Sequence, residues 1–487
     1  MVRSLAGILL LLSALGTPLA DSGGVGDVIY DDETYTGDLD AIAERGILRI
    51  LVTNSRTDFF FDQGRIRGIQ YESALAFMEH INRGRTNRFH ASEANRIFPK
   101  FVPVSFSELI PALESGRGDI AAAFLTITPE RSAQADFASP QVTEVSEVIV
   151  AHKSADPITR LADLSGKAVY VLKDSSYYTH LVDLNRKLSI TGLAPVAIVE
   201  ADEQLLTEDI LELVNAGIVE YTVCDDFKAE LWAAVLPDIR LSREAPLSHA
   251  QGVGWAIRKG SPQLKAALDE FSGKVRQGSF LGNVLFRRYF DNTEWIDNPM
   301  AQQEREKFDQ LIELFRQYGD AYGFDPLALA AQAYQESKFN HSLRSHRGAI
   351  GIMQLLPTTA RDPNVNIPKI EVLENNIHAG AKYMSFLRER YFSDESISPI
   401  NQRLLSWAAY NAGPANVLRI RRDAEEVGLD PNVWFGNVEN MAAKKISREP
   451  VRYVANIYKY YTAYRLMQEK EEARVEALKG LLEERTW

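Results

Sequence analysis

The first half of the chain alternates between short apolar runs and longer amphipathic stretches. The apolar runs lie at 48–52, 120–124, 167–171 and 221–224. Runs of this length are typical of buried strands, and amphipathic stretches such as 71–81 are typical of helices. Because strand-like and helix-like segments alternate from about 41 to 290, this region predicts an α/β domain of two lobes.

The second half of the chain has the hydrophobic period of helices throughout. The clearest predicted helices lie at 304–322, 326–337, 377–391 and 403–411. The last segment, 461–487, is rich in charged residues with apolar residues at helical spacing. This pattern predicts a solvated surface helix, with a partner-binding helix as the alternative. The polar segment 291–303 holds Pro299 and suits a linker between the two halves.

The N-terminus has the layout of a secretory signal. Arg3 is followed by an apolar run at 5–15 and by a short segment that ends at Ala20. The run is shorter than the roughly 20 residues needed to span a bilayer, so we expect export with cleavage near Ala20 rather than a retained anchor helix. Cys224 is the single cysteine of the chain, so no intramolecular disulfide can form.

These patterns divide the chain into five parts. They are a signal segment at 1–20, a two-lobed α/β domain at 41–290, a linker at 291–303, a mostly helical domain at 304–460 and a charged helical tail at 461–487. A length of 487 residues fits two to four domains at about 150 residues each.

Composition and charge narrow the classes of function. The chain is 45% hydrophobic and 25% charged, which is typical of a soluble globular protein. Acidic residues outnumber basic ones by 66 to 54, and the formal net charge is -12. Because nucleic-acid binding needs clustered positive charge, we do not expect nucleic acid as a partner.

Glu336 stands at the end of the apolar face of one predicted helix. At 3.6 residues per turn, Leu329, Ala333 and Glu336 share one face of helix 326–337. Burial there raises the pKa of a carboxyl group, and a carboxyl that stays protonated near neutral pH can act as a general acid. The alternative, from this helix alone, is an ordinary helix-end glutamate paired with Lys338 or Arg344.

Ordered motifs in the second half favour the catalytic interpretation. Three of them are continuous: Glu-Ser-Lys-Phe-Asn at 336–340, Ser-His-Arg-Gly-Ala-Ile-Gly-Ile-Met-Gln-Leu-Leu-Pro at 345–357, and Ala-Tyr-Asn-Ala-Gly-Pro at 409–414. Between the second and the third stand Asn376, Ile377, Gly380 and Tyr383. After the third stand Glu449, Tyr453 and Val454. Together they resemble the lytic transglycosylase domain of the soluble lytic transglycosylase family. The resemblance implies a lysozyme-like α fold with Glu336 as catalytic acid and base.

The same resemblance implies roles for residues around Glu336. The residues expected to contact substrate are Ser337, Met353, Gln354, Tyr410, Asn411 and Tyr453. The alternatives are core packing for Met353 and a buried, hydrogen-bonded tyrosine for Tyr410. The histidines show no paired ligand spacing, and we expect neither a metal nor another cofactor.

The motifs supply one carboxylate where ordinary glycosidases use two. Asp320, Asp325 and Asp362 are acidic residues on either side of Glu336 in sequence, and they lie in turn-like or helix-capping contexts. The resemblance implies a lyase of the lytic exotransglycosylase type, which cleaves peptidoglycan glycan strands and leaves 1,6-anhydromuramic ends. The alternatives are a hydrolytic muramidase, which needs a second carboxylate, and a non-catalytic sensor of peptidoglycan or muropeptides.

The first domain carries a second set of motifs, at 106–120, 126–131 and 136–140. In this order they resemble the periplasmic amino-acid-binding proteins of transport systems. The resemblance implies that Thr126 and Arg131 bind a ligand carboxylate, since an arginine can hold a carboxylate through two hydrogen bonds.

The second lobe matches the amino-acid-binding pattern less closely. The resemblance implies that Ser175 and Ser176 lie at a ligand-contacting turn and that Asp225 receives an α-amino group. Phe124 and Asp174 stand where these proteins usually have glycine. The alternatives are therefore a cleft reshaped for another ligand and a purely structural domain.

A binding domain followed by a transglycosylase domain resembles the membrane-bound lytic murein transglycosylase F family. This arrangement implies a periplasmic protein, with peripheral association with the outer membrane as a further expectation. A muropeptide or an amino acid in the first domain could regulate the second if it bound two arrangements with different affinity.

Overall fold

The structure is a computed structural model. It describes residues 33–55, 57–62, 65–83, 96–276, 279, 282–283, 285, 302–447 and 449–484. The predicted signal segment 1–20 and residues 291–301 of the predicted linker lie outside the described residues.

A mixed β-sheet runs through both lobes of the first domain. Its strand order is β4-β1-β5-β12-β7-β10-β8-β9, with β6 paired to β12 and β11 paired to β7. The strands are β1 (Ile47–Val52), β4 (Phe98–Pro103), β5 (Ile120–Thr126), β6 (Ala135–Phe137), β7 (Val142–His152), β8 (Ala168–Val171), β9 (Ala197–Glu200), β10 (Tyr221–Asp225), β11 (Ile239–Ser242) and β12 (Ser248–Arg258). Every residue of β5 is buried, as expected for a strand with helices on both faces.

Two long antiparallel strands, β7 and β12, join the lobes. In the first lobe β12 pairs with β5, and in the second lobe β7 pairs with β10. They also pair with each other, with register shifts along β12. The sheet is therefore continuous from one lobe to the other.

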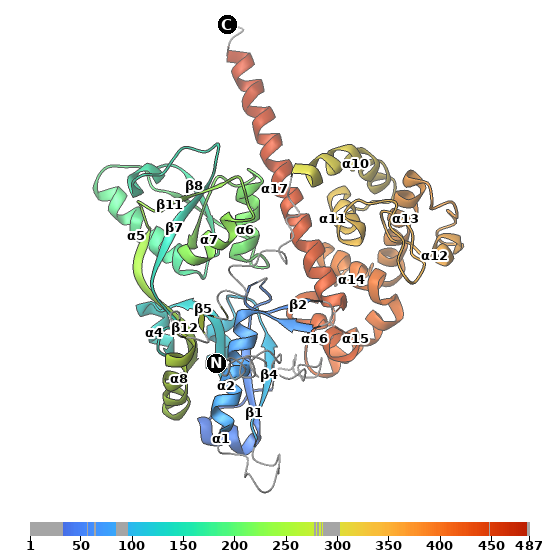
Figure 1. Cartoon of the computed structure of the whole chain (residues 1–487). Helices are drawn as coiled ribbons and strands as arrows, with labels where there is room; N and C mark the ends of the chain where they lie inside the picture. The colour runs from blue at the N-terminus through green and yellow to red at the C-terminus, as the bar shows by residue number, and fades with distance from the viewer. Residues whose placement is uncertain are drawn as a thin grey trace, which may run out of the picture.

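Helices cover the sheet of the first domain (Figure 1). The first lobe holds α1 (Leu39–Arg45), α2 (Ile69–Asn82), α3 (Leu109–Glu114), α4 (Pro129–Gln134) and α8 (Pro262–Val275), together with the hairpin of β2 (Phe60–Asp62) and β3 (Arg65–Arg67). The second lobe holds the short helix η3 (Leu161–Leu164), α5 (Ser176–Ile190), α6 (Thr207–Asn215) and α7 (Asp226–Ala233). This is the predicted two-lobed α/β fold.

The second domain consists of helices around one core. They are α10 (Gln302–Ala321), α11 (Pro326–Ser337), α12 (Pro357–Arg361), α13 (Leu373–Tyr391), α14 (Pro399–Ala412), α15 (Pro414–Glu426), the π-helical turn η5 (Trp434–Val438), α16 (Glu439–Lys445) and α17 (Glu449–Glu484). The predicted fold class, an α/β domain followed by a mostly α domain, is confirmed.

Helix α17 is a single continuous element of 36 residues, about 54 Å long at 1.5 Å per residue. The predicted boundary between the helical domain and the tail, at 460/461, therefore falls inside this helix. Its residues Tyr461 and Tyr464 are buried, whereas its C-terminal end projects past both domains (Figure 1). The predicted solvated helix begins later than expected, because the first turn of the tail packs in the core.

Helix α17 also contacts the second lobe of the first domain. The Lys459 Nζ lies 2.8 Å from Asp209 Oδ1 and 3.7 Å from Glu212 Oε2, both in α6. The Tyr458 hydroxyl donates to Asp202 Oδ2 at 2.8 Å. One hydrophobic cluster includes buried side chains of both domains, so the domains share a core as well as ion pairs.

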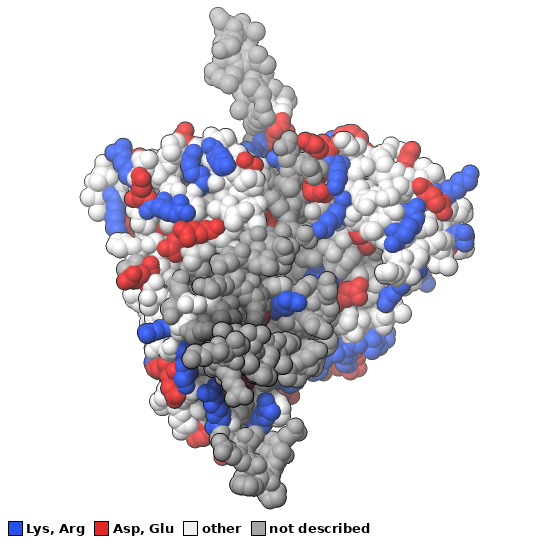
Figure 2. Space-filling view, viewed as in Figure 1, with Lys and Arg blue, Asp and Glu red and all other residues white. Residues whose placement is uncertain are grey.

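The surface carries charges of both signs. On the face that Figure 2 displays, basic and acidic side chains are interspersed over both domains. Among the residues that the structure describes, none of the helices combines the length and the apolar character needed to cross a membrane.

Candidate active site and ligand cleft

Glu336 lies in the last turn of α11, and the residues at the two ends of this helix determine where it starts and stops. Asp325 caps the start of the helix by accepting a hydrogen bond from the Leu327 N–H, and Pro326 fits the first turn because its missing N–H needs no partner there. The helix ends at Lys338, whose backbone is left-handed with a φ of 51°. The side chain of Glu336 thus leaves the helix at its boundary with the loop that follows.

The carboxylate of Glu336 accepts a hydrogen bond from α17. The Tyr453 hydroxyl donates to Glu336 Oε1 at 2.5 Å, and Gln332 Nε2 donates to the same hydroxyl at 3.3 Å. Gln332 is fully buried and lies one turn before Glu336 in α11. This chain of hydrogen bonds orients the carboxylate.

Burial raises the pKa of Glu336 from its ordinary value of 4.5 to about 7. The hydrogen bond from Tyr453 opposes the shift, and the charge of Glu449 adds to it. A carboxyl with this pKa is partly protonated at neutral pH, which suits a group that first donates and then accepts a proton.

The segment 350–355 is held by several hydrogen bonds, one of them from Ser337, the residue that follows Glu336. Ser337 donates from Oγ to the Ile352 carbonyl at 2.9 Å, and the Tyr410 hydroxyl donates to the Met353 carbonyl at 2.6 Å. Gln354 has a left-handed backbone with a φ of 45°, and its Nε2 donates to the Gly351 carbonyl at 2.8 Å.

The residues predicted to contact substrate do not all face solvent. Met353 is fully buried, and a Cβ added at Gly380 would approach its Cγ to 2.7 Å. The side chain of Met353 is therefore packed in the core, which was the alternative to substrate contact. Tyr410 and Tyr453 lie close enough to Glu336 for its charge to raise their pKa values further, after the larger effect of burial. Asn411 follows Tyr410 near the end of α14.

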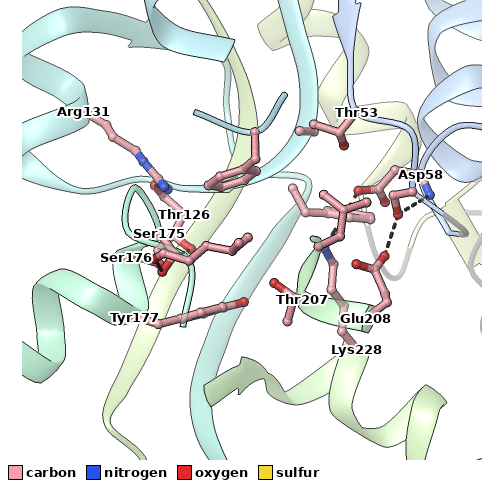
Figure 3. A pocket seen from close by; sticks show the side chains of 16 residues that line it. Thr53, Asp58, Thr126, Arg131, Ser175, Ser176, Tyr177, Thr207, Glu208 and Lys228 are labelled. Atoms are coloured by element: carbon pink, nitrogen blue, oxygen red, sulfur yellow. Dashed lines mark hydrogen bonds and ion pairs between the residues drawn. The ribbon is translucent and has the colours of Figure 1, made fainter. Parts of the chain in front are cut away.

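The first domain has a cavity between its lobes (Figure 3). The cavity has a volume of about 30 Å³, room for roughly two water molecules. The predicted ligand-binding residues that line it are Thr126, Arg131, Ser175 and Ser176. The predicted receptor of an amino group, Asp225, is buried at the end of β10 and is not among the lining residues.

The predicted carboxylate-binding groups already bond across the cleft. Arg131, in α4 of the first lobe, donates to the Thr126 carbonyl at 3.0 Å and to the Asp174 carbonyl of the second lobe at 2.9 Å. Ser176 donates from Oγ to Thr126 Oγ1 at 3.2 Å. Ser175 caps α5 by accepting from the Tyr178 N–H. The lobes are therefore closed on each other at this end.

A second group of contacts closes the opposite end of the cavity. Ser55 Oγ and Thr57 Oγ1, from the loop after β1, donate to Glu208 Oε1 at 2.5 Å and 3.0 Å. The Nζ of Lys228, in α7, lies 3.8 Å from Asp58 Oδ2. Sequence reasoning missed this group, because its members come from three separate segments.

Comparison with known proteins matches each half of the chain to a protein family. Residues 48–292 match the family described as bacterial extracellular solute-binding proteins, family 3, and residues 313–430 match the transglycosylase SLT domain. A membrane-bound lytic murein transglycosylase F of Desulfosudis oleivorans is 28% identical over 450 residues, which cover 89% of this chain and 93% of the relative. One of Aliivibrio fischeri is also 28% identical, over 87% of this chain and 84% of the relative.

The chain belongs to the membrane-bound lytic murein transglycosylase F family. Among solved structures, an ancestral arginine-binding protein bound to arginine is similar to 51% of the chain, with 25% identity, a TM-score of 0.41 and 99% of that protein covered.

Two polar residues of this transglycosylase F family member support the site and were not among the predicted site residues. Gln332 bonds to Tyr453 as described above. Asn376 is fully buried; its Oδ1 accepts from the Met353 N–H at 2.8 Å, and its Nδ2 donates to the Ile350 and Ile370 carbonyls at 2.9 Å. The motif contained Asn376, but a single sequence does not show that a polar residue in an amphipathic helix points into the core.

In this family member, Tyr453→Phe should change the pH dependence of turnover. The hydroxyl lowers the pKa of Glu336, so its loss should raise that pKa above about 7 and move the alkaline limb of the rate profile to higher pH. We also expect a lower rate at the optimum, by about tenfold to a hundredfold, because the carboxylate loses an orienting partner. The measurement is turnover of sacculi from pH 5 to 9, with Tyr458→Phe as the control; an unmoved alkaline limb would contradict the role of the hydroxyl.

Proposed function

We propose that this protein is an exported peptidoglycan lytic transglycosylase that cleaves the β-1,4 bond between N-acetylmuramic acid and N-acetylglucosamine. The observation that carries the proposal is the carboxyl of Glu336, which has a pKa raised to about 7 and is oriented by Tyr453. The family of the chain supports the same activity, since its relatives are named as lytic murein transglycosylases.

In the proposed mechanism Glu336 acts twice. Its protonated form donates the proton to the glycosidic oxygen as the bond from that oxygen to the anomeric carbon breaks, and the N-acetyl group of the muramic residue stabilises the anomeric centre. The C6 hydroxyl of the same sugar then bonds to the anomeric carbon, and its proton returns to Glu336. The products are a 1,6-anhydromuramic end and a free N-acetylglucosamine end, and no water is consumed.

A muramidase is the second candidate, since it would hydrolyse the same bond with water. It needs a second carboxylate within about 5 to 10 Å of the first. Glu449 is exposed, lies one helical turn before Tyr453 in α17 and acts electrostatically on Glu336. It is therefore the residue to consider for that role.

Digestion of purified sacculi, followed by mass spectrometry of the products, separates the candidates. We expect 1,6-anhydromuropeptides without incorporation of oxygen from ¹⁸O-labelled water. Labelled reducing ends would establish the muramidase and contradict the transglycosylase. Binding to sacculi with no soluble product would leave a non-catalytic sensor.

We also infer that the protein works in the periplasm, with peripheral attachment to the outer membrane. The secretory pattern of residues 1–20 supports export. The relatives are named as membrane-bound enzymes, which supports attachment to a membrane.

The first domain is proposed to bind a small carboxylate ligand, such as a muropeptide or an amino acid, that regulates the transglycosylase. Glu208 lines the cavity, while Asp209 and Glu212 of the same helix pair with Lys459 in α17. Helix α17 also carries Tyr453, which bonds to the catalytic carboxylate. A ligand that moved α6 could thus favour one arrangement of the site over another.

Arg131→Ala should weaken this binding strongly. The substitution removes the partner of the ligand carboxylate, and loss of one member of a buried charge pair costs about 2 to 5 kcal/mol, or at least a thirtyfold weaker affinity. Calorimetric titration of the full mature chain with muropeptides and amino acids measures the effect. Unchanged affinity in the variant would contradict the assignment of Arg131.

A further inference from the structure

The two ends of the cavity between the lobes differ in chemistry (Figure 3). Arg131 lies at one end, near the hydroxyls of Ser175 and Ser176. Asp58 and Glu208 lie at the other end, together with Lys228. A ligand with a carboxylate and an ammonium group would place the first at Arg131 and the second at the acidic end.

The acidic end already holds an ammonium group of the chain itself. The side chain of Lys228 is only 11% exposed, and its Nζ lies 3.8 Å from Asp58 Oδ2. The same Nζ lies 5.3 Å from the centroid of the Phe124 ring. Carboxylates and an aromatic face are the groups that hold ammonium ions in binding sites, so Lys228 occupies such a site from within the chain.

The charge of Lys228 persists despite its burial. Burial alone would lower the pKa of the amine, but the carboxylates of Asp58, Glu208 and Asp225 outweigh it and raise the pKa above its ordinary value of 10.5. A ligand ammonium at the same end would therefore meet a like charge in a poorly solvated environment, which disfavours its binding.

Phe124 reduces the room for a second cation. Its ring is 6% exposed and packs on Phe227 with the centroids 5.2 Å apart. The resemblance to amino-acid-binding proteins implies glycine at this position, so here an aromatic ring fills space that a smaller residue would leave open. Phe124, which replaces the expected glycine, and the ammonium group of Lys228 thus lie at the same end of the cavity.

One acceptor at this end remains without a donor. Asp58 Oδ1 is buried and has no hydrogen-bond partner within the described part of the chain, although Asp58 lines the cavity. Buried acceptors are normally satisfied. A neutral amide N–H could satisfy this oxygen without bringing a second positive charge close to Lys228.

We propose that Lys228 takes the place of a ligand ammonium group, so that the cleft binds carboxylates whose amine is acylated, such as an N-acyl amino acid or the C-terminal residue of a peptide, in preference to free amino acids. The inference rests on the proposed ligand binding by the first domain and names the chemical class of that ligand. Because the cavity has a volume of only about 30 Å³, the proposal requires the lobes to separate when such a ligand binds.

The first experiment titrates the full mature chain with matched pairs of probes. The pairs are alanine, glutamate and glutamine, in both enantiomers, each with its Nα-acetyl derivative. We expect at least one acetylated member to bind at least tenfold more tightly than its free counterpart. A free amino acid that bound as tightly as its acetylated partner, or more tightly, would overturn the proposal.

The second experiment tests whether Lys228 fills an ammonium site. Lys228→Ala leaves the surrounding carboxylates without their cation, so methylammonium chloride should raise the thermal midpoint of this variant by several degrees relative to sodium chloride at equal ionic strength. The parent protein should show no such difference. The matched control is Lys265→Ala, which removes a more exposed lysine that pairs with Asp269 at 2.7 Å.

The outcomes separate this inference from the function proposed above. If methylammonium stabilises the parent and the Lys228 variant equally, the site is not filled by Lys228 and the proposal fails. If the variant does not fold, the probe pairs on the parent protein still decide. If neither series of probes binds, the proposal fails together with ligand binding by the cleft, whereas release of anhydromuropeptides from sacculi tests the transglycosylase independently.

Discussion

Replacement of Glu336 by glutamine should lower the release of anhydromuropeptides by roughly three to four orders of magnitude, because one group performs both proton transfers. Glutamine has nearly the same shape and can still accept a hydrogen bond from Tyr453 through its Oε1. The variant should therefore fold and bind sacculi as the parent does. The measurement is product release from sacculi at pH 6 to 7, with binding followed by co-sedimentation.

The free energy of unfolding of Glu336→Gln tests whether the carboxyl of Glu336 is buried. The pKa of Glu336 is about 7 in the folded protein against 4.5 ordinarily, so ionisation favours the unfolded chain as the pH rises from 4.5 to 7. The cost to the parent is absent below about pH 4.5 and complete above pH 7. Glu336→Gln should thus unfold with a free energy about 1 to 3 kcal/mol higher than the parent at pH 8 and nearly equal to it at pH 4.5.

Glu425→Gln, on the exposed surface of α15, is the control for both measurements. It should change neither turnover nor the pH dependence of unfolding. Residual activity of a tenth or more in Glu336→Gln would remove Glu336 from the mechanism. An equal effect of both variants on stability would show that the result does not come from the burial of Glu336.

Asn376→Ala should have a large effect although Asn376 does not touch the proposed substrate. The substitution leaves the Met353 N–H and two main-chain carbonyls without their partner in the core, which should destabilise the protein by about 2 to 4 kcal/mol. Because the segment 350–355 is bonded to Ser337, next to Glu336, and to Tyr410, turnover should fall as well, even at temperatures where the variant is folded.

Chemical unfolding and sacculus digestion at 15 °C measure these two effects. The neighbouring Asn375→Ala is the matched control, since Asn375 is half-buried and donates to the Lys369 carbonyl alone at 3.1 Å. It should cost less than about 1 kcal/mol and leave turnover unchanged. Equal losses in the two variants would mean that the hydrogen bonds of Asn376 have no special part in holding the segment.

The elements with a strong local pattern were predicted well from the sequence. Helix α11 matches the predicted range 326–337 because Asp325 and Pro326 mark its start chemically. Helix α13 begins at Leu373, four residues before the predicted start at 377, since no side chain caps its N-terminus. The tail was predicted as a separate helix because charge in its sequence increases after 461, whereas the packing of Tyr461 and Tyr464 makes it part of α17.

The site was predictable only as far as the motif reaches. The motif indicated Glu336, Tyr410 and Tyr453, and the structure brings both tyrosines close to the Glu336 carboxylate. Their roles in substrate binding and catalysis stay predictions. Contacts formed between distant segments could not be read from periodicity. The bond from Gln332 to Tyr453 joins residues 121 positions apart, and the ion pair of Asp58 with Lys228 joins two lobes.

The pairing of α17 with α6 makes the relative orientation of the two domains depend on a residue count. Tyr453 faces the carboxylate of Glu336, and Lys459 faces the second lobe, and the two are six residues apart on one uninterrupted helix. Each residue inserted or deleted between them would turn Lys459 by about 100° around the helix axis relative to Tyr453. A change in the length of this stretch would therefore misalign the docking face with the active site, whereas a substitution at an exposed position within it would keep the two faces aligned.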